Sequence, residues 1–196
     1  MKEIEKIALF DLDGTLCNYD RTIEEEYNLL KSFDEPSYRY FKHNEEPSHF
    51  KERIKKIRNK KGWWEKLPKL ELGFDVLKIA KELEFNIHIL TKDPASSYNA
   101  WTEKAKWVKG NIKTDYPNAK LTITEDKGLV YGTVLVDDWI EYVERWLTWR
   151  PRGVVIMPAH PWNEGYSNSN VTRYDGTNIT QVKERMHWAK NRTHNI

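Results

Sequence analysis

Two aspartates two residues apart, Asp11 and Asp13, follow the short apolar run at residues 7–10 and stand just before Gly14. The run is unbroken and apolar, which predicts a buried strand with both carboxylates at its end. A carboxylate there can bind a divalent cation, act as a nucleophile or transfer a proton. The plainer alternative is a solvated turn after a strand, which involves no chemistry.

Polar side chains also follow two later apolar segments. Thr91 ends the segment at residues 86–91. Asp137 ends the segment at residues 133–137 and is followed directly by Asp138, and Lys127 lies 10 residues before Asp137. Carboxylates from two strands can hold Mg2+ while a substrate phosphate fills another coordination position. A hydroxyl and an ammonium group suit the remaining phosphate oxygens. Each residue alone is a weak signal, but their order along the chain indicates one phosphate-binding rim.

Alternating strands and helices are expected to position these groups. Short segments rich in branched residues at 86–91, 121–124, 133–137 and 153–157 resemble the first strand, and residues 74–83 have a helical apolar pattern. A further helix is indicated by Trp101, Ala105 and Val108 at a spacing of three to four. This alternation predicts an α/β fold, a three-layer Rossmann-like parallel sheet with helices on both faces. Ligands of such sheets bind beyond the carboxyl ends of the strands.

Residues 18–70 interrupt the alternation. Thr22 with Glu25 matches a capping box, Ser48 is a candidate start of a second helix, and the loop between them is rich in Pro, Asn and Glu. These features predict a helical cap over the site, with residues 1–17 and 71–196 as the catalytic core. The tail after residue 158 is expected to be irregular until a last helix, indicated by Ile179, Val182, Met186 and Ala189.

Bulk composition excludes few classes of protein. Of 196 residues, 32 are Lys or Arg and 30 are Asp or Glu, so the net charge of +2 gives no global reason to expect nucleic acid as an obligatory partner. No stretch approaches the roughly 20 apolar residues of a membrane span, so no membrane partner is expected. A single cysteine, Cys17, fits a reducing compartment. We therefore expect a cytoplasmic protein, with a homodimer left open.

The polar motifs together resemble the phosphatase branch of the haloacid dehalogenase superfamily. The resemblance rests on DLDGT at 11–15, Thr91, Lys127 and VDD at 136–138, and it covers the whole core. It implies that Asp11 is the nucleophile and Asp13 the general acid and then base. Asp11 must then be ionised and Asp13 initially protonated, while Gly14 lets the chain turn so that both face one phosphate.

The same resemblance implies the remaining roles. Thr91 and Lys127 would be phosphate ligands, and Mg2+ would be held by Asp11, Asp137 and the backbone carbonyl of Asp13. Asp138 would be a supporting acid. The reaction would proceed through an aspartyl-phosphate, which divides one difficult step into two.

A narrower resemblance is to the 5'(3')-deoxyribonucleotidases. It is carried by segments 62–78, 91–112, 126–138 and 157–163, which are spread over most of the chain. It implies a nucleoside monophosphate as the small-molecule substrate, with a preference for pyrimidine deoxyribonucleotides.

Aromatic residues are the candidates for base recognition. Trp63 and Trp64 offer flat apolar surfaces on which a pyrimidine can stack, although they would serve equally well in the core of a cap. Tyr19, just beyond the nucleophile loop, is a candidate for the same pocket.

The chain also departs from the family pattern. Lys92 and Asp93 stand where relatives usually have small residues, and this places Lys92 among the expected phosphate-binding residues. Trp139 stands where relatives often have a basic residue. These departures concern the choice of base and the activity on 3'-phosphates rather than the phosphate chemistry.

Three alternatives share the core residues. One is a phosphatase for another small phosphate ester, and another is a nucleic-acid 3'-end phosphatase that uses the basic stretch at 51–61. That stretch is more simply a solvated helix face, because Ile54 and Ile57 supply a narrow apolar side. The third is a nucleotide-binding module without catalysis, which the full set of acids, threonine and lysine argues against.

Overall fold

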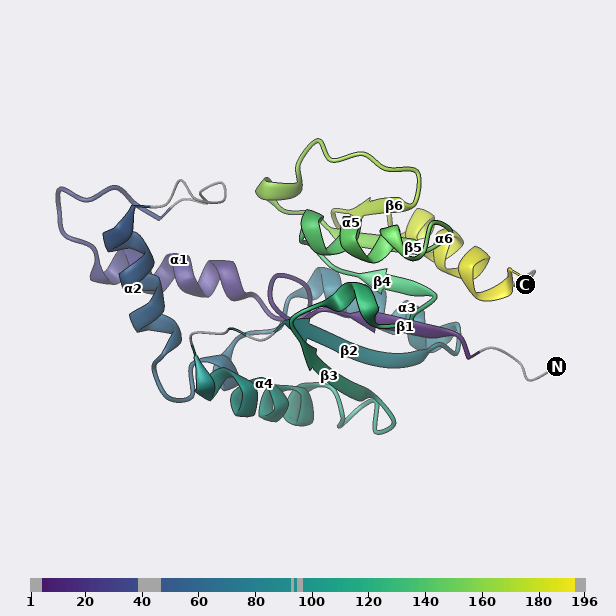
Figure 1. Ribbon diagram of the computed structural model, residues 1–196, viewed down its shortest axis with the longest axis horizontal. Helices are drawn as coiled ribbons and strands as arrows, with labels where there is room; N and C mark the ends of the chain where they lie inside the picture. The colour runs from purple at the N-terminus through teal and green to yellow at the C-terminus, as the bar shows by residue number, and fades with distance from the viewer. Residues whose placement is uncertain (1–4, 39–46, 93, 95–96, 193–196) are drawn as a thin grey trace.

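A six-stranded sheet forms the centre of the protein (Figure 1). The computed structural model describes residues 5–38, 47–92, 94 and 97–192. All neighbouring strands pair in parallel, in the order β3-β2-β1-β4-β5-β6. The strands are β1 (Ile7–Phe10), β2 (Asn86–Lys92), β3 (Lys120–Thr124), β4 (Val134–Val136), β5 (Val154–Pro158) and β6 (Val171–Tyr174). The predicted parallel α/β sheet is confirmed.

Helices cover both faces of this sheet. They are α1 (Tyr19–Leu30), α2 (Ser48–Arg58), α3 (Glu71–Glu82), α4 (Tyr98–Asn111), α5 (Ile140–Thr148) and α6 (Ile179–Asn191), with short 3-10 helices η1 (Trp64–Lys66), η2 (Lys127–Leu129) and η3 (Pro161–Asn163). Side chains alternate along β1, so Ala8 and Phe10 pack with α3, α4 and α6, while Leu9 packs on the opposite face with α5. The expected three layers therefore form.

Helices α1 and α2 lie to one side of the sheet, beyond its carboxyl end (Figure 1). They pack against each other through Ile23, Tyr27, Phe50 and Ile57, and these side chains continue the main apolar cluster. Because the two helices stand outside the sheet layers and beside the carboxyl edge of the sheet, we propose residues 18–70 as a cap. Within the described part of the chain, no helix has the length and apolar character that crossing a membrane requires.

Two local predictions, on the tail and on the start of the first cap helix, were wrong. The tail contains a strand, β6. Its inward residues Thr172 and Tyr174 are buried, although the residues around them in the sequence are mostly polar. Helix α1 begins at Tyr19 after Asn18 without a side-chain cap, and the Thr22 hydroxyl donates to the Asn18 carbonyl instead of capping a later helix. Strand β6 forms because it pairs with β5, whereas Thr22 is taken up by a local hydrogen bond to the carbonyl four residues earlier.

The inward face of α4 also differs from the prediction. Trp101 and Ala105 are exposed, and of the predicted residues only Val108 is buried. The buried face instead contains Lys104 and Trp107. A buried lysine interrupts the apolar periodicity, which is why the pattern pointed to the wrong side.

Helix α3 approaches the loop after β1 so closely that Gly73 cannot carry a side chain. A Cβ at Gly73 would lie 1.9 Å from the Thr15 carbonyl oxygen. We expect Gly73→Ala to lower the free energy of unfolding by about 3 kcal/mol, because a backbone atom cannot yield as a side chain can. Gly110→Ala is the matched control, since a Cβ there meets nothing within 4 Å. Urea unfolding should show the control slightly more stable than wild type, and equal destabilisation of both variants would contradict the prediction.

Candidate active site

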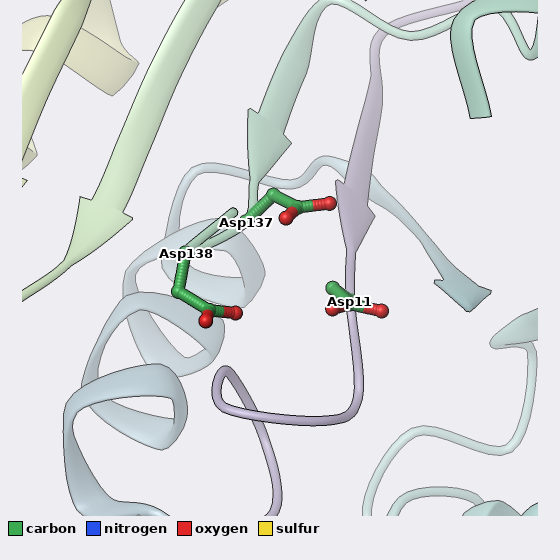
Figure 2. Close-up of side chains that lie close together, drawn as sticks. All are labelled: Asp11, Asp137 and Asp138. Carbon is green, nitrogen blue, oxygen red and sulfur yellow. The ribbon is translucent and has the colours of Figure 1, made fainter. Parts of the chain in front are cut away.

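Three buried carboxylates meet beyond the carboxyl ends of β1 and β4 (Figure 2). These strands are neighbours in register, with Phe10 opposite Val136, so the next residues, Asp11 and Asp137, emerge side by side. Asp138 follows directly. One oxygen from each of the three carboxylates lies within 4.8 Å of the others. The order of residues along parallel strands therefore produces an acidic cluster from separate segments of the chain.

Lys127 from η2 lies against this cluster. Its Nζ is 2.7 Å from Asp11 Oδ1 and 2.8 Å from Asp137 Oδ2, and its side chain is almost fully buried. Burial opposes the charge on Lys127, but the two carboxylates outweigh it and raise the pKa of the ammonium group. Burial also opposes the charge on Asp11, and it raises the pKa of this carboxyl to about 7, although the nearby Lys127 ammonium group acts in the other direction. One ammonium group thus only partly neutralises the buried acids.

Asp138 is held by donors from two loops. Its Oδ1 accepts a hydrogen bond from Thr15 at 2.9 Å, and its Oδ2 accepts one from the Trp162 indole at 3.1 Å. Gly14 lies so close that a Cβ there would be 2.5 Å from Asp138 Oδ2, and its φ of 76° is in the left-handed region. Burial, with Asp137 and Asp11 adding repulsion, raises the pKa of Asp138 well above its ordinary value. Position 14 therefore needs glycine for two reasons: its φ is positive, and a side chain there would clash with the Asp138 carboxylate.

His160 contacts the loop that follows β1. Its Nε2 lies 2.6 Å from the Gly14 carbonyl oxygen, and its ring stacks on Trp162 with centroids 4.2 Å apart. Burial lowers the pKa of His160, so the neutral ring is favoured. These contacts give His160 a structural hydrogen bond to the loop after β1.

A second cation lies beside Asp13, and the sequence analysis missed it. Lys104 Nζ donates to Asp13 Oδ2 at 2.6 Å, to Thr91 Oγ1 at 3.0 Å and to the Lys92 carbonyl at 2.9 Å. Lys104 is only 2% exposed, so these contacts replace water around its charge. The available signal was its position three residues before Trp107 on the inward face of α4. Thr91, at the end of β2, is thereby joined to Asp13.

The acids form one wall of a cleft of about 340 Å³. Its lining consists of Asp11, Asp13, Tyr19, Asp20, Arg58, Trp64, Lys92, Pro94, Lys104, Lys127, Asp138, Trp139, Tyr142 and Trp162. The predicted residues Asp11, Asp13, Lys92 and Lys127 therefore face one space, while Thr91 and Asp137 are fully buried beside it. Asp93 lies outside the described residues.

Aromatic rings from the cap region reach the cleft. Tyr19 and Trp64 both line it and stack on each other, with ring centroids 5.5 Å apart. Trp63 does not line the cleft; it packs edge-on against Tyr19, and its indole donates to Glu26 at 2.7 Å. Of the two tryptophans proposed from the sequence, the structure brings Trp64 to the cleft and places Trp63 behind Tyr19.

Two polar cap residues at the cleft were also missed by the sequence analysis. Asp20 lines the cleft, and burial raises its pKa to about 7, with Asp13 adding repulsion. Arg58, at the end of α2, lines it as well and donates to the Tyr19 hydroxyl at 3.5 Å. The only sequence signal for Arg58 was the basic stretch at 51–61, which is too long to single out one residue.

The donor set fits a hard divalent cation. Asp11, Asp137 and Asp138 supply carboxylate oxygens, which are the ligands that Mg2+ prefers. Lys127 contacts two of these three buried carboxylates, so one positive charge faces three acids. The residues present therefore suit a magnesium ion in both ligand type and charge.

Two solved structures are similar to this chain over most of its length. A Thermotoga maritima protein described as a beta-phosphoglucomutase matches with a TM-score of 0.53 and 13% identity, covering 92% of this chain and 98% of its own. CbbY from Rhodobacter sphaeroides in complex with phosphate matches with a TM-score of 0.44 and 12% identity, covering 87% and 93%. At these identities the first match shows the fold alone. Comparison with curated proteins finds no matching sequence.

A family match is more specific than the shared fold. The sequence model of the family described as 5' nucleotidase, deoxy (pyrimidine), cytosolic type C matches residues 5–184. The matched region contains every strand of the sheet and all the side chains that line the cleft. Because this match extends over most of the sequence, the chain belongs to the family of cytosolic type C pyrimidine 5' deoxynucleotidases.

Proposed function

We propose that this phosphoric monoester hydrolase is a Mg2+-dependent nucleotidase that prefers pyrimidine 5'(3')-deoxyribonucleotides and acts through an aspartyl-phosphate on Asp11. The observation that supports it most is the convergence of Asp11, Asp13, Asp137 and two buried lysines on one aromatic cleft. The family description supports a nucleotide as the substrate and the cytosol as the location.

The proposed reaction has two steps. An Asp11 carboxylate oxygen attacks phosphorus while the bond from phosphorus to the ester oxygen breaks, and Asp13 gives that oxygen its proton. Asp13 then takes a proton from water, whose oxygen attacks the phosphoryl group, so that phosphate leaves and Asp11 is regenerated. When bound by Asp11, Asp137 and the Asp13 carbonyl, Mg2+ would supply charge neutralisation for the phosphoryl oxygens.

Lysines on both sides of Asp11 and Asp13 would orient the groups that react. Lys127 holds Asp11 against Asp137, and we propose that it and Thr91 also bind phosphate oxygens. Lys104 fixes Asp13 relative to Thr91, which makes it a positioning residue. Lys92 lies over the Tyr142 ring at 5.1 Å from the ring centroid, close enough to the cleft to serve the substrate anion.

Lys104→Met is expected to lower kcat by about 10- to 100-fold. The variant keeps the length of the side chain but removes the charge-assisted hydrogen bonds to Asp13 and Thr91, each worth about 1.5–3 kcal/mol. The ratio of kcat for a nitrophenyl phosphate to kcat for an alkyl phosphate should rise, because only the alkyl leaving group depends on a well-placed Asp13. Lys109→Met, on the exposed side of α4, is the control. If this ratio of kcat values is the same in Lys104→Met and Lys109→Met, Lys104 does not position Asp13.

Trp64→Ala is expected to raise KM for dUMP by about 10-fold while changing KM for a small aryl phosphate little. The reason is that stacking of a base on an aromatic ring contributes about 1–3 kcal/mol. Trp63→Ala is the matched control, because Trp63 is equally enclosed but does not line the cleft. A Trp64 variant that affects both substrates equally would count against stacking at this ring.

A substrate panel tests the function itself. Phosphate release from dUMP and dTMP should exceed release from ribonucleotides, a hexose phosphate and a 3'-phosphorylated oligonucleotide under the same conditions. The cleft has about 340 Å³ of space, which suits a mononucleotide rather than a duplex end. Faster turnover of the hexose phosphate or of the oligonucleotide would replace the nucleotide proposal with the corresponding alternative.

A further inference from the structure

Three arginines converge at the edge of the sheet opposite the catalytic cleft. Arg150 and Arg152 precede β5, and Arg192 follows α6. Together with Tyr131 and the backbone of Gly132 and Gly153, they line a separate cavity of about 210 Å³. β4 and β5 begin at this edge of the sheet (Figure 1), whereas the acids follow the opposite ends of β1 and β4, so the cavity is distinct from the active site.

These guanidinium groups have no acidic partner among the residues that the structure describes. Arg150 donates to the Gly128 carbonyl at 2.7 Å and to the Trp146 carbonyl at 3.5 Å, and Arg192 donates to the Arg152 carbonyl, so these acceptors are all neutral. Elsewhere in the described chain, some arginines have acidic partners: Arg53 pairs with Glu35 and Arg145 with Asp126. The charge at this edge is therefore left uncompensated by the described chain.

Two donor atoms in this group are buried without an acceptor. Within the described ranges, Arg150 Nε and Arg192 Nε have no hydrogen-bond partner. Burial lowers the pKa of both guanidinium groups, and repulsion from Arg152 and Arg185 adds to the shift at Arg192. A buried donor that lacks an acceptor is costly, so an acceptor in the cavity would stabilise this arrangement.

We propose that this cavity, lined by Arg150, Arg152, Arg192 and Tyr131, is a second anion site that binds a phosphate group. Guanidinium groups offer planar pairs of N–H donors that match the oxygens of phosphate, and three of them give the cavity a charge suited to a multiply charged oxyanion. At about 210 Å³ the cavity is smaller than the roughly 300–1,000 Å³ of sites for drug-sized ligands. It therefore suits inorganic phosphate or the terminal phosphates of a larger molecule.

Backbone amides of glycines permit a direct test on the full-length protein. Gly132 and Gly153 line the arginine cavity, whereas Gly14 reports on the active site. In ¹⁵N–¹H spectra, sodium phosphate should shift the Gly132 and Gly153 signals saturably, and sodium chloride at equal ionic strength should not. Because active-site binding is observed separately at Gly14, the result does not depend on the proposed nucleotidase activity.

Arg152→Gln and Arg192→Gln are the test variants, since neither belongs to the catalytic cleft. Each should weaken binding by about 10-fold or more, as expected for loss of a charge-assisted hydrogen bond. Arg21→Gln, on the exposed surface of α1, removes the same charge far from the cavity and should leave the titration unchanged. Arg150→Gln is less suitable because Arg150 packs on Trp146, with 5.1 Å from its Cζ to the ring centroid.

Tripolyphosphate distinguishes the two sources of the phosphate group. Tighter binding of tripolyphosphate than of inorganic phosphate would identify the terminal phosphates of a larger molecule as the ligand, and the reverse order would identify the free ion. The proposal is overturned if phosphate shifts only Gly14, if chloride reproduces the shifts at Gly132 and Gly153, or if the two test variants titrate like Arg21→Gln.

Discussion

Replacing Asp11 by asparagine should lower phosphate release from dUMP by about 10⁴-fold or more. The amide has nearly the shape of the carboxylate but cannot form the proposed aspartyl-phosphate, and loss of a nucleophile ordinarily costs this much or more. Asp11 is also the residue that Lys127 contacts at 2.7 Å, so the substitution removes the charge at the centre of the site. Steady-state assays of released phosphate measure the effect.

Two controls separate chemistry from folding. Asp11→Asn should unfold in urea at a midpoint at or above that of wild type, because it removes one of several buried carboxylates that repel each other. Asp75→Asn, a carboxylate on α3 outside the cleft, should retain activity. Turnover of Asp11→Asn within tenfold of wild type would exclude Asp11 as the nucleophile.

Removing divalent cations should lower activity by about 10³-fold, and added Mg2+ should restore it. A metal that neutralises phosphoryl oxygens contributes several kcal/mol to transition-state stabilisation, and each 1.4 kcal/mol corresponds to a factor of ten. The acidic cluster supplies the physical reason, because burial raises the pKa of Asp11 to about 7 despite the Lys127 contact. Assays after dialysis against a chelator, with and without Mg2+, measure the loss.

Stability gives a second measurement of the same site. Mg2+ should raise the unfolding temperature of the wild-type protein, because binding to the folded state stabilises it and relieves repulsion among Asp11, Asp137 and Asp138. In Asp137→Asn the shift should largely disappear, whereas Asp75→Asn should keep it. Full activity in chelator, or an equal shift in both variants, would remove the metal from this cluster.

Much of the catalytic edge was predictable because parallel strands impose it. Asp11, Thr91 and Asp137 each come at or just after the end of an apolar segment, and in a parallel sheet those ends share one edge. The position of Lys127 followed from the resemblance to known phosphatases, and the family match confirms the relationship on which it depended. The β6 strand was missed because its four residues alternate with polar neighbours and have no independent apolar run.

The sequence analysis missed Lys104, which supports Asp13 and Thr91, because a buried charge has no recognisable sequence pattern. Lys104 has the sequence appearance of a solvent-exposed residue on a charged helix, and only the packing of α4 turns it toward Asp13 and Thr91. Trp63 and Trp64 are adjacent and chemically identical, yet one lines the cleft and the other packs behind Tyr19. Trp63 lies on a turn and Trp64 begins η1, so their side chains point in different directions, and no spacing rule assigns them.

The amino-acid sequence by itself determined the fold class and brought Asp11, Thr91 and Asp137 to one edge of the sheet, because apolar segments and strand ends are local features with a fixed geometric consequence. Tertiary structure alone decided the partners of Asp13 and Asp138, the choice between the two tryptophans and the arginine cavity at the far edge. These depend on contacts between residues up to 123 positions apart, as in Thr15 with Asp138. Such contacts follow from how helices and loops pack on the sheet, which no local pattern of residues encodes.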